Sequence, residues 1–163
     1  MAYNRDKIYQ QAEEVSLSKG FQLLDNKFNS EKEFEENLLP KLERIINEMY
    51  GLDIESIETQ KFYSLKEQGY YQAKLDIFIT TKQGVNIVIE SKNPIHEKTE
   101  IINSFSQLMS YQFLLEKHGI DAIYILATSV FDFKYIEYMK RFKIKYDIIV
   151  NNKTSAGFWI NDL

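Results

Sequence analysis

The sequence predicts an α/β protein built on a mixed β-sheet of four to six strands with helices on its faces. In residues 53–92 apolar side chains recur at every second position, which is typical of β-strands. Before and after this stretch they recur every three to four positions, as on one face of a helix. Residues 122–127 are apolar throughout, which suits a buried central strand.

Length and composition indicate one compact globular domain. The chain has 163 residues, which is a usual length for a single domain, and 44% hydrophobic residues are enough to build a core and exclude disorder. There is no cysteine, so disulfide scaffolds, thiolate zinc sites and cysteine nucleophiles are excluded. The longest apolar run is residues 122–127, far below the roughly 18 residues of a membrane span, so we expect a cytoplasmic protein with no membrane partner.

The distribution of charge matters more than its sum. The 20 basic and 24 acidic residues give a net charge of −4, which by itself disfavours non-specific nucleic-acid binding. Residues 30–58, however, hold nine acidic and three basic residues, a net of −6, and the rest of the chain carries 17 basic and 15 acidic residues, a net of +2. A nucleic-acid partner is therefore not excluded.

Two helices are expected before the strands. Residues 4–17 have the spacing of an amphipathic helix. A second, longer helix begins at Ser30, because Ser30 and Glu33 fit a capping box, and ends at Gly51. Pro40 lies inside its apolar stripe and should bend or break it, since proline removes a backbone donor and crowds the preceding turn.

The alternating segment predicts three strands, at about residues 54–59, 71–79 and 85–90, joined as an antiparallel meander. In the second strand one face should carry Ala73, Leu75, Ile77 and Ile79, and the other Gln72, Lys74, Asp76 and Phe78. A helix from about Ile101 to His118 then crosses over to the strand at 122–127. A shorter helix at 132–142 and two candidate strands at 146–150 and 157–160 complete the chain.

We therefore expect one domain with three parts. Residues 1–29 form an N-terminal helical extension, residues 30–128 form the core, and residues 129–163 extend the sheet.

The residues most suited to chemistry lie on the second and third strands. Glu90 and Lys92 end an otherwise apolar strand two positions apart, so they project from the same face of the sheet. Asp76 lies on the neighbouring strand, with 13 residues between it and Glu90, and the two carboxylates can converge. Together with the main-chain carbonyl of Ser91 they would form an oxygen site suited to Mg²⁺, for which Mn²⁺ should substitute. Lys92 would orient an attacking water or neutralise charge on a phosphate.

This pattern, Asp76 followed by Glu90-Ser91-Lys92, resembles the PD-(D/E)xK nuclease superfamily, whose core is a helix, three strands, a helix and a strand in this order. Leu75 stands where the motif often has proline. The resemblance implies a restriction-endonuclease-like core over residues 30–128.

Two further elements extend the resemblance. Gln107 and Tyr111 lie one helical turn apart after the Glu-x-Lys strand, which is similar to the Gln-x-x-x-Tyr arrangement of RecB-type nucleases. The helix that follows Ser30 resembles the first helix of the N-terminal nuclease domain of type I restriction R subunits. In those families a glutamate on this helix points into the site; Glu31 is the closest match by spacing, and Glu35, one turn away, is the rival.

The resemblance implies Mg²⁺-dependent hydrolysis of phosphodiester bonds in nucleic acid, here expected to be DNA, in the style of a restriction or phage nuclease. Gln107 and Tyr111 would contact phosphate, and so would a basic strip that includes Lys140, Arg141 and Lys143. A homodimer would allow a double-strand cut.

The alternative is a catalytically inactive domain of the same fold that binds nucleic acid or a protein. A Glu-x-Lys pair on a strand, a polar pair on a helix and a run of lysines are also features of ordinary solvated surfaces. Glu31 itself has a structural explanation, because an acidic residue in the first turn of a helix is favoured by the helix dipole.

Overall fold

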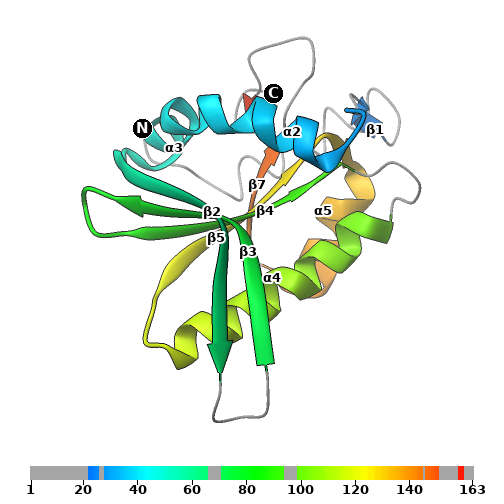
Figure 1. The fold of residues 1–163 in the computed structure, drawn as a ribbon. Helices are drawn as coiled ribbons and strands as arrows, with labels where there is room; N and C mark the ends of the chain where they lie inside the picture. Colours follow the sequence, from blue (N-terminus) through cyan, green and yellow to red (C-terminus); the bar gives the residue numbers. More distant parts are fainter. Residues whose placement is uncertain are drawn as a thin grey trace.

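The structure is a computed structural model that describes residues 22–25, 28–65, 71–93, 99–144, 146–150 and 158–159. Its centre is a mixed sheet of six strands in the order β2-β3-β4-β5-β7-β8. Helices α2 and α3 cover one face of this sheet, and α4 and α5 cover the other (Figure 1). The strands are β2 (Ile54–Leu65), β3 (Tyr71–Thr81), β4 (Asn86–Lys92), β5 (Ala122–Thr128), β7 (Asp147–Val150) and β8 (Phe158–Trp159).

The direction of the strands divides the sheet into an antiparallel and a parallel part. Strands β2, β3 and β4 pair antiparallel, as the short connections of the sequence predict. Strands β4, β5 and β7 pair parallel, because a helix lies between each strand and the next, and β8 returns antiparallel beside β7. The residues expected to carry chemistry therefore lie where the meander joins the parallel strands.

The first helical layer is broken in two, as expected from Pro40. Helix α2 (Glu31–Leu38) begins at Ser30, whose Oγ accepts a hydrogen bond from the backbone N–H of Glu33 at 3.1 Å. A single 3₁₀ turn, η1 (Leu39–Lys41), contains the proline and leads into α3 (Leu42–Tyr50). Gly51 ends α3 in the left-handed conformation, with φ at +68°.

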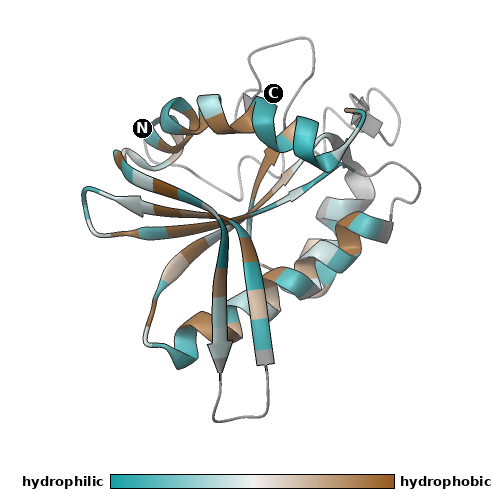
Figure 2. Ribbon diagram, in the orientation of Figure 1, coloured by the Kyte–Doolittle hydropathy of each residue, from teal (hydrophilic) through white to brown (hydrophobic). Residues whose placement is uncertain are grey.

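This layer is attached to the sheet by an apolar face with no exposed atoms. Phe34 and Leu38 of α2 are completely buried, and so are the four apolar residues of α3 that face the strands. They pack against isoleucines of β3, β4 and β5 to form one of the two cores, and Figure 2 shows apolar residues concentrated on the central strands. Those six helical residues are Phe34, Leu38, Leu42, Ile45, Ile46 and Met49.

The second layer consists of α4 (Thr99–Lys117), the crossover between β4 and β5, and α5 (Phe133–Arg141). The two helices contact each other through Phe105 and Tyr138, whose rings stack with centroids 5.8 Å apart. The second core lies between these helices and the sheet, and it includes Phe105, Leu108, Tyr135 and Met139.

One pair of short strands was not expected from the sequence. Strand β1 (Gln22–Asp25) pairs antiparallel with β6 (Val130–Asp132) in a separate two-stranded sheet. The assignment of residues 1–29 to a helical extension is therefore wrong for residues 22–25. The helix predicted over residues 4–17 lies outside the described residues.

The prediction that β3 keeps one apolar face along its whole length is also wrong. Ala73 and Leu75 belong to the core beneath α4, whereas Ile77 and Ile79 belong to the core beneath α3. The strand changes face at Asp76, and the ribbon formed by β2 and β3 bends visibly near its middle (Figure 1). The far half of this ribbon leaves the plane of the sheet and packs over α4.

The cause of the change is visible in the backbone of the partner strand. Thr59 pairs with Ile77 and Lys61 with Leu75, so Gln60 lies opposite Asp76. Gln60 has a φ of +56°, which a residue with a Cβ adopts only at a cost. The alternation of side chains along β3 is reset at this position. Asp76 therefore belongs to neither of the two apolar faces.

A buried polar clamp joins the segment before α2 to the end of β4. The side chain of Asn93 accepts a hydrogen bond from the backbone N–H of Phe28 at 2.9 Å and donates one to the carbonyl of Phe28 at 2.6 Å. Ser129 Oγ donates to Asn93 Oδ1 at 2.6 Å, and the N–H of Ser129 donates to the carbonyl of Lys92 at 3.2 Å. The start of α2 is thereby held against the ends of β4 and β5.

The remaining sequence predictions of the fold are largely confirmed. The α/β class, the mixed sheet, the meander, the crossover helix and the two strands after α5 are present. The first predicted strand is longer than expected, since β2 continues from residue 59 to Leu65.

Replacing Gln60 by glycine tests the strain at the bend. We expect Gln60→Gly to raise the free energy of unfolding by about 0.5–1 kcal/mol, because relief of a positive φ outweighs the extra backbone entropy of glycine. Thr59→Gly is the matched control and should lower it by about 1 kcal/mol, since Thr59 is an ordinary exposed strand residue. Thermal or urea unfolding of both variants measures the difference, and equal destabilisation by the two would contradict the strain.

Candidate active site

Three acidic side chains from three elements meet at the end of β4. Asp76 comes from the bend of β3, Glu90 from β4 and Glu35 from α2. Ser91 links two of them, Asp76 and Glu35. Its backbone N–H donates to Asp76 Oδ2 at 3.1 Å, and its hydroxyl lies 3.3 Å from the same oxygen and 3.2 Å from Glu35 Oε2. The sequence predicted Ser91 as a ligand through its carbonyl, and the structure adds its hydroxyl as a bridge.

Glu90 is the most buried charged group of the cluster, with 3% of its surface exposed. Burial, and then the neighbouring carboxylate of Asp76, raise the pKa of Glu90 to about 8; Lys92 and a hydrogen bond from Tyr111 oppose this rise. With no metal ion bound, a pKa of about 8 favours the protonated form of the Glu90 carboxyl at neutral pH, in spite of Lys92.

Glu35 shows the same effect more weakly. Burial and the charge of Asp76 raise the pKa of Glu35, and its hydrogen bond with Ser91 lowers it. The cluster therefore brings three carboxyl groups close together, and the pKa values of two of them, Glu35 and Glu90, are raised.

Lys92 lies between two carboxylates. Its Nζ is 3.9 Å from Glu90 Oε1 and 3.7 Å from Glu31 Oε1, and 18% of its side chain is exposed. The sequence left Glu31 and Glu35 as rivals for the helix carboxylate. The structure brings both to the site, Glu31 to the lysine and Glu35 to Ser91 and Asp76.

Gln107 and Tyr111 lie beside the cluster on α4. Tyr111 is 8% exposed and hydrogen-bonds the carboxyl of Glu90, whereas Gln107 is exposed. Both line a shallow groove of about 490 Å³ between α4 and the bent half of β3. Its other lining residues are Gln72, Ala73, Lys74, Ser106 and Ser110. Gln107 and Tyr111 thus lie on one face of α4, which runs from the buried carboxyl of Glu90 to the surface.

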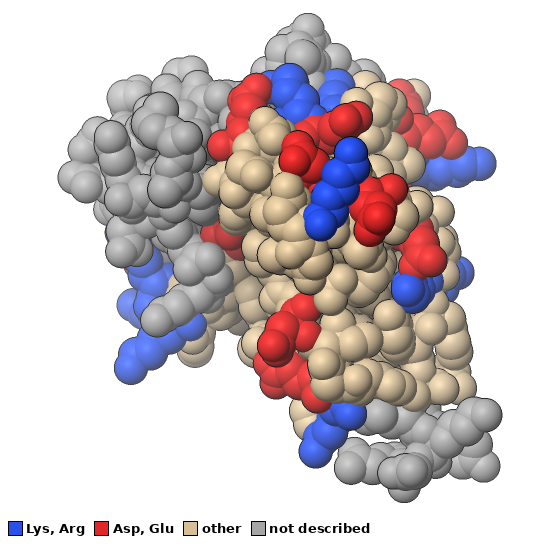
Figure 3. Space-filling view, turned by 90° about the vertical axis from the view of Figure 1, so that its left-hand side faces the viewer, with Lys and Arg blue, Asp and Glu red and all other residues tan. Residues whose placement is uncertain are grey.

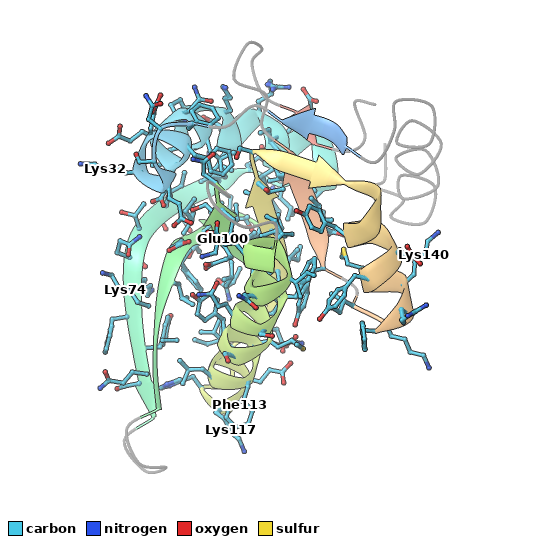
Figure 4. All side chains as sticks on the ribbon, turned by 90° about the vertical axis from the view of Figure 1, so that its right-hand side faces the viewer. Lys32, Lys74, Glu100, Phe113, Lys117 and Lys140 are labelled. Atoms are coloured by element: carbon cyan, nitrogen blue, oxygen red, sulfur yellow. The ribbon has the colours of Figure 1, made fainter. Side chains whose placement is uncertain are left out.

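The predicted basic strip does not join the cluster. Lys140 and Arg141 end α5, and Lys143 follows in the turn after it. Figure 4 shows Lys140 on the outer side of α5, on the opposite side of α4 from Lys74. Lys143 lies near Ala122 at the beginning of β5, whereas Glu90 pairs with Leu126 farther along the same strand.

The surface charge is mixed where the acidic helices lie. Figure 3 shows lysine and arginine side chains interleaved with acidic ones toward the top of the face that it presents. Arg44 and Glu48 on α3 are one such pair, with Nη1 and Oε1 3.4 Å apart. Two lysines from outside residues 30–58 offset part of that segment's net charge of −6, because Lys61 pairs with Glu58 and Lys92 with Glu31.

The donors of the cluster suit a hard divalent cation. Glu90 Oε2 is buried and has no hydrogen-bond partner among the described residues. Leaving a buried carboxylate oxygen unpaired is costly, and Mg²⁺ prefers carboxylate and carbonyl oxygens. Within the described part of the chain no group of three or more His, Cys, Asp or Glu side chains is arranged as a complete ligand set. Asp76, Glu90 and the carbonyl of Ser91 would supply only part of a ligand set, so a cation held here would keep several of its waters.

Sequence reasoning missed the features that depend on tertiary contacts. The Ser91 hydroxyl bridge and the Asn93 clamp join residues 56 and 65 positions apart, which no local pattern reveals. Asn93 directly follows Lys92. A polar amide at the end of an apolar strand was the signal available for it.

No protein-family model and no curated protein matches the chain. None of the helices in the described part of the chain is both long and apolar enough to cross a membrane.

The raised pKa of Glu90 predicts how stability changes with pH. In the folded state its pKa is about 8, against an ordinary value of 4.5, so between these values the folded protein holds a proton that the unfolded chain has lost. Without divalent cations, stability should therefore fall as pH rises from about 4.5 to 8, by an amount on the order of a few kcal/mol.

The matched variant is Glu90→Gln, which cannot ionise. It should flatten this part of the profile, and it should be more stable than the wild type at pH 8 but not at pH 4.5. Urea unfolding in EDTA across this range measures both proteins, and parallel profiles would contradict the assignment of the buried proton to Glu90.

Proposed function

We propose that the protein is a metal-dependent nuclease of the PD-(D/E)xK type that hydrolyses phosphodiester bonds of DNA. The observation that carries this proposal is the convergence of Asp76, Glu90 and Lys92 at the end of β4, with a buried oxygen of Glu90 left unpaired. The carboxyl groups of Glu31, Glu35, Asp76 and Glu90 surround a single lysine, which is more acidic groups than one ion pair needs.

The order of the elements supports a restriction-endonuclease-like core. A helix, an antiparallel meander, a crossover helix and a parallel strand follow one another as α2–α3, β2–β3–β4, α4 and β5. The motif residues lie on β3 and β4, where the resemblance expects them. The bend at Asp76 explains how this carboxylate can take part in the cluster, since the bend turns it out of the apolar faces of β3.

Asp76, Glu90 and the carbonyl of Ser91 would hold Mg²⁺, and Mn²⁺ should replace it. When bound, the ion would supply Lewis-acid activation of the phosphate and lower the pKa of a coordinated water. Binding of a cation would also favour the charged form of Glu90, whose burial is otherwise unfavourable.

Lys92 would act on the substrate as a fixed positive charge. It is held near Glu90 and Glu31, and its partly exposed ammonium group can donate hydrogen bonds to a phosphate oxygen or to the attacking water. Glu31 would position the lysine, because its carboxylate is the partner on the side of α2.

Glu35 would have a different role from Glu31. It shares the Ser91 hydroxyl with Asp76, and its pKa is raised by burial and by that carboxylate. It is thus placed to orient Asp76 and to accept a proton near the reacting phosphate. Both glutamates contribute in this proposal, Glu31 through Lys92 and Glu35 through the carboxylates.

The groove beside the cluster would bind a strand of the DNA substrate. It is lined by uncharged polar side chains and by Lys74, which suits contacts to phosphate and sugar. Tyr111 connects the groove to the centre, since it lines the groove and also hydrogen-bonds Glu90. DNA bound in this groove would not need to contact the basic strip at the end of α5.

Cleavage of supercoiled plasmid with Mg²⁺, Mn²⁺ or EDTA tests the proposal. We expect metal-dependent nicking that falls at least about 100-fold in Asp76→Asn and in Lys92→Met, because each removes a charge needed in the transition state. Lys82→Met is the matched control, since Lys82 is exposed in the β3–β4 turn, and it should keep full activity.

Circular dichroism and calorimetric Mg²⁺ titration accompany the assay. Asp76→Asn should keep the fold and lose metal binding. Metal-independent band shifts of DNA without cleavage, unchanged by both variants, would instead identify an inactive binding module of the same fold.

The two helix glutamates can be separated by kinetics. We expect Glu35→Gln to shift the pH dependence of the cleavage rate, because it removes a titrating group beside Asp76. Glu31→Gln should lower the rate by about 10-fold without moving the profile, since it only loosens Lys92. Identical profiles for the two variants would contradict the division of roles.

A further inference from the structure

Three large apolar side chains are exposed on the face formed by α4 and the turn after α5. Met109 and Phe113 lie one helical turn apart on α4 and are 48% and 47% exposed, and Phe142, in the turn after α5, is 61% exposed. Met109 and Phe142 line the same cavity, so the two elements present their apolar groups together. Exposed apolar side chains gathered in this way are typical of protein–protein contacts.

The same face is hollowed between these side chains. The cavity has a volume of about 550 Å³ and is bounded by α4, by the beginnings of β5 and β7, and by the turn after α5. Apolar and aromatic side chains make up most of its lining, among them Ile123, Ile144 and Tyr146. One face of the molecule thus carries both projecting apolar groups and a hollow of matching character.

Two opposite charges flank the apolar groups. On the α4 side, Gln112 lines the cavity and its Nε2 donates to Glu116 Oε1 at 3.1 Å, which places this exposed carboxylate beside the cavity. On the other side, Lys143 directly follows Phe142 and lines the cavity. Among the described residues, the ammonium group of Lys143 has no hydrogen-bond or ion-pair partner. The apolar centre therefore lies between an acidic and a basic side.

Two other basic side chains nearby are placed differently. Lys117 lies with its Nζ over the ring of Phe113, 5.6 Å from the ring centroid, at the lower end of α4 in Figure 4. Lys140 lies on the outer side of α5, as the same view shows. Of the residues that line the cavity, Lys143 is thus the one that offers a positive charge to a partner.

These features suit a second copy of the chain, related to the first by a twofold axis. In a twofold interface the same patch is used by both copies, so one face must hold both halves of every contact. A half turn about the middle of this face brings Lys143 toward the partner's Glu116, and Phe142 toward the partner's Met109 and Phe113. The order of charged and apolar groups across the face is thus complementary to itself.

We propose that the protein forms a homodimer through this face. Phe142 of each copy packs against the partner's Met109 and Phe113 at the mouth of the cavity. Two ion pairs between Glu116 and Lys143, one on each side of the axis, fix the orientation of the copies.

The interface lies away from the carboxylate cluster. On β5 the cavity reaches residues 122–124, whereas Glu90 pairs with Leu126, farther along the same strand. Each copy of the dimer therefore keeps its own cluster outside the contact, and the proposal stands whether or not that cluster cleaves DNA.

Sedimentation equilibrium in EDTA, at protein concentrations from about 1 to 300 μM, tests the proposal. We expect a mass that rises with concentration toward twice that of one chain. Phe142→Ser should weaken the dimer at least about 10-fold, because it removes the most exposed ring of the face from both copies. Phe62→Ser is the matched control and should dimerise as the wild type does, since Phe62 is 58% exposed on β2, outside this face.

Reversal of the flanking charges tests the twofold arrangement. Glu116→Lys and Lys143→Glu should each weaken the dimer at least about 5-fold, because each turns two ion pairs into pairs of like charge. An equimolar mixture of these two variants should recover the affinity of the wild type, since every opposing pair in the mixed dimer again joins opposite charges. Lys140→Glu is the control for charge and should leave the dimer unchanged.

Three results would overturn the proposal. They are the mass of a single chain at every concentration, a dimer that Phe142→Ser leaves unchanged, and a dimer weakened by both reversals that does not recover in the mixture. Circular dichroism verifies that each variant is folded. Asp76→Asn should dimerise as the wild type does, so failure of the nuclease proposal is distinguishable from failure of this one.

Discussion

The hydrogen bond from the Ser91 N–H to Asp76 is the contact around which the candidate site is arranged. It joins β4 to β3 at the point where β3 changes face, and it holds Asp76 close enough to Glu90 to raise the pKa of that buried carboxyl. The same serine reaches Glu35 through its hydroxyl. One residue thus ties Asp76 to Glu35 and holds both beside the carboxyl of Glu90.

The apolar packing of the helical layers offsets the repulsion between the carboxylates of the cluster. Phe34 and Leu38 fix α2 on the sheet with no exposed surface, so Glu31 and Glu35 on the same helix have little freedom to move away. Full burial of such side chains stabilises by about 1.5–3 kcal/mol each, which is enough to offset the repulsion of neighbouring carboxylates. The neighbouring carboxylates therefore repel one another, and the packing of the core supplies the stability that keeps them together.

Local patterns in the sequence predicted the elements but not their distortions. The capping box at Ser30, the break at Pro40 and the alternation of β4 depend on neighbours within a few residues, and these were predicted correctly. The bend at Asp76 depends on the backbone of Gln60 in another strand, so period-two alternation placed Leu75 and Ile77 wrongly on one face. The spacing of Asp76, Glu90 and Lys92 predicted that these side chains converge, whereas the bridge made by Ser91 Oγ depends on the packing of α2.

The Asn93 clamp has a consequence for how the chain acquires its site. It links Phe28 to Asn93 across 65 positions and Asn93 to Ser129 across 36, so it closes only after β4, the crossover helix and β5 are in place. Contacts of such long sequence separation form slowly, because the entropy lost on closing a long loop must first be offset. A chain emerging from the ribosome would therefore carry Asp76, Glu90 and Lys92 before the clamp that holds the start of α2 against β4 and β5 could close.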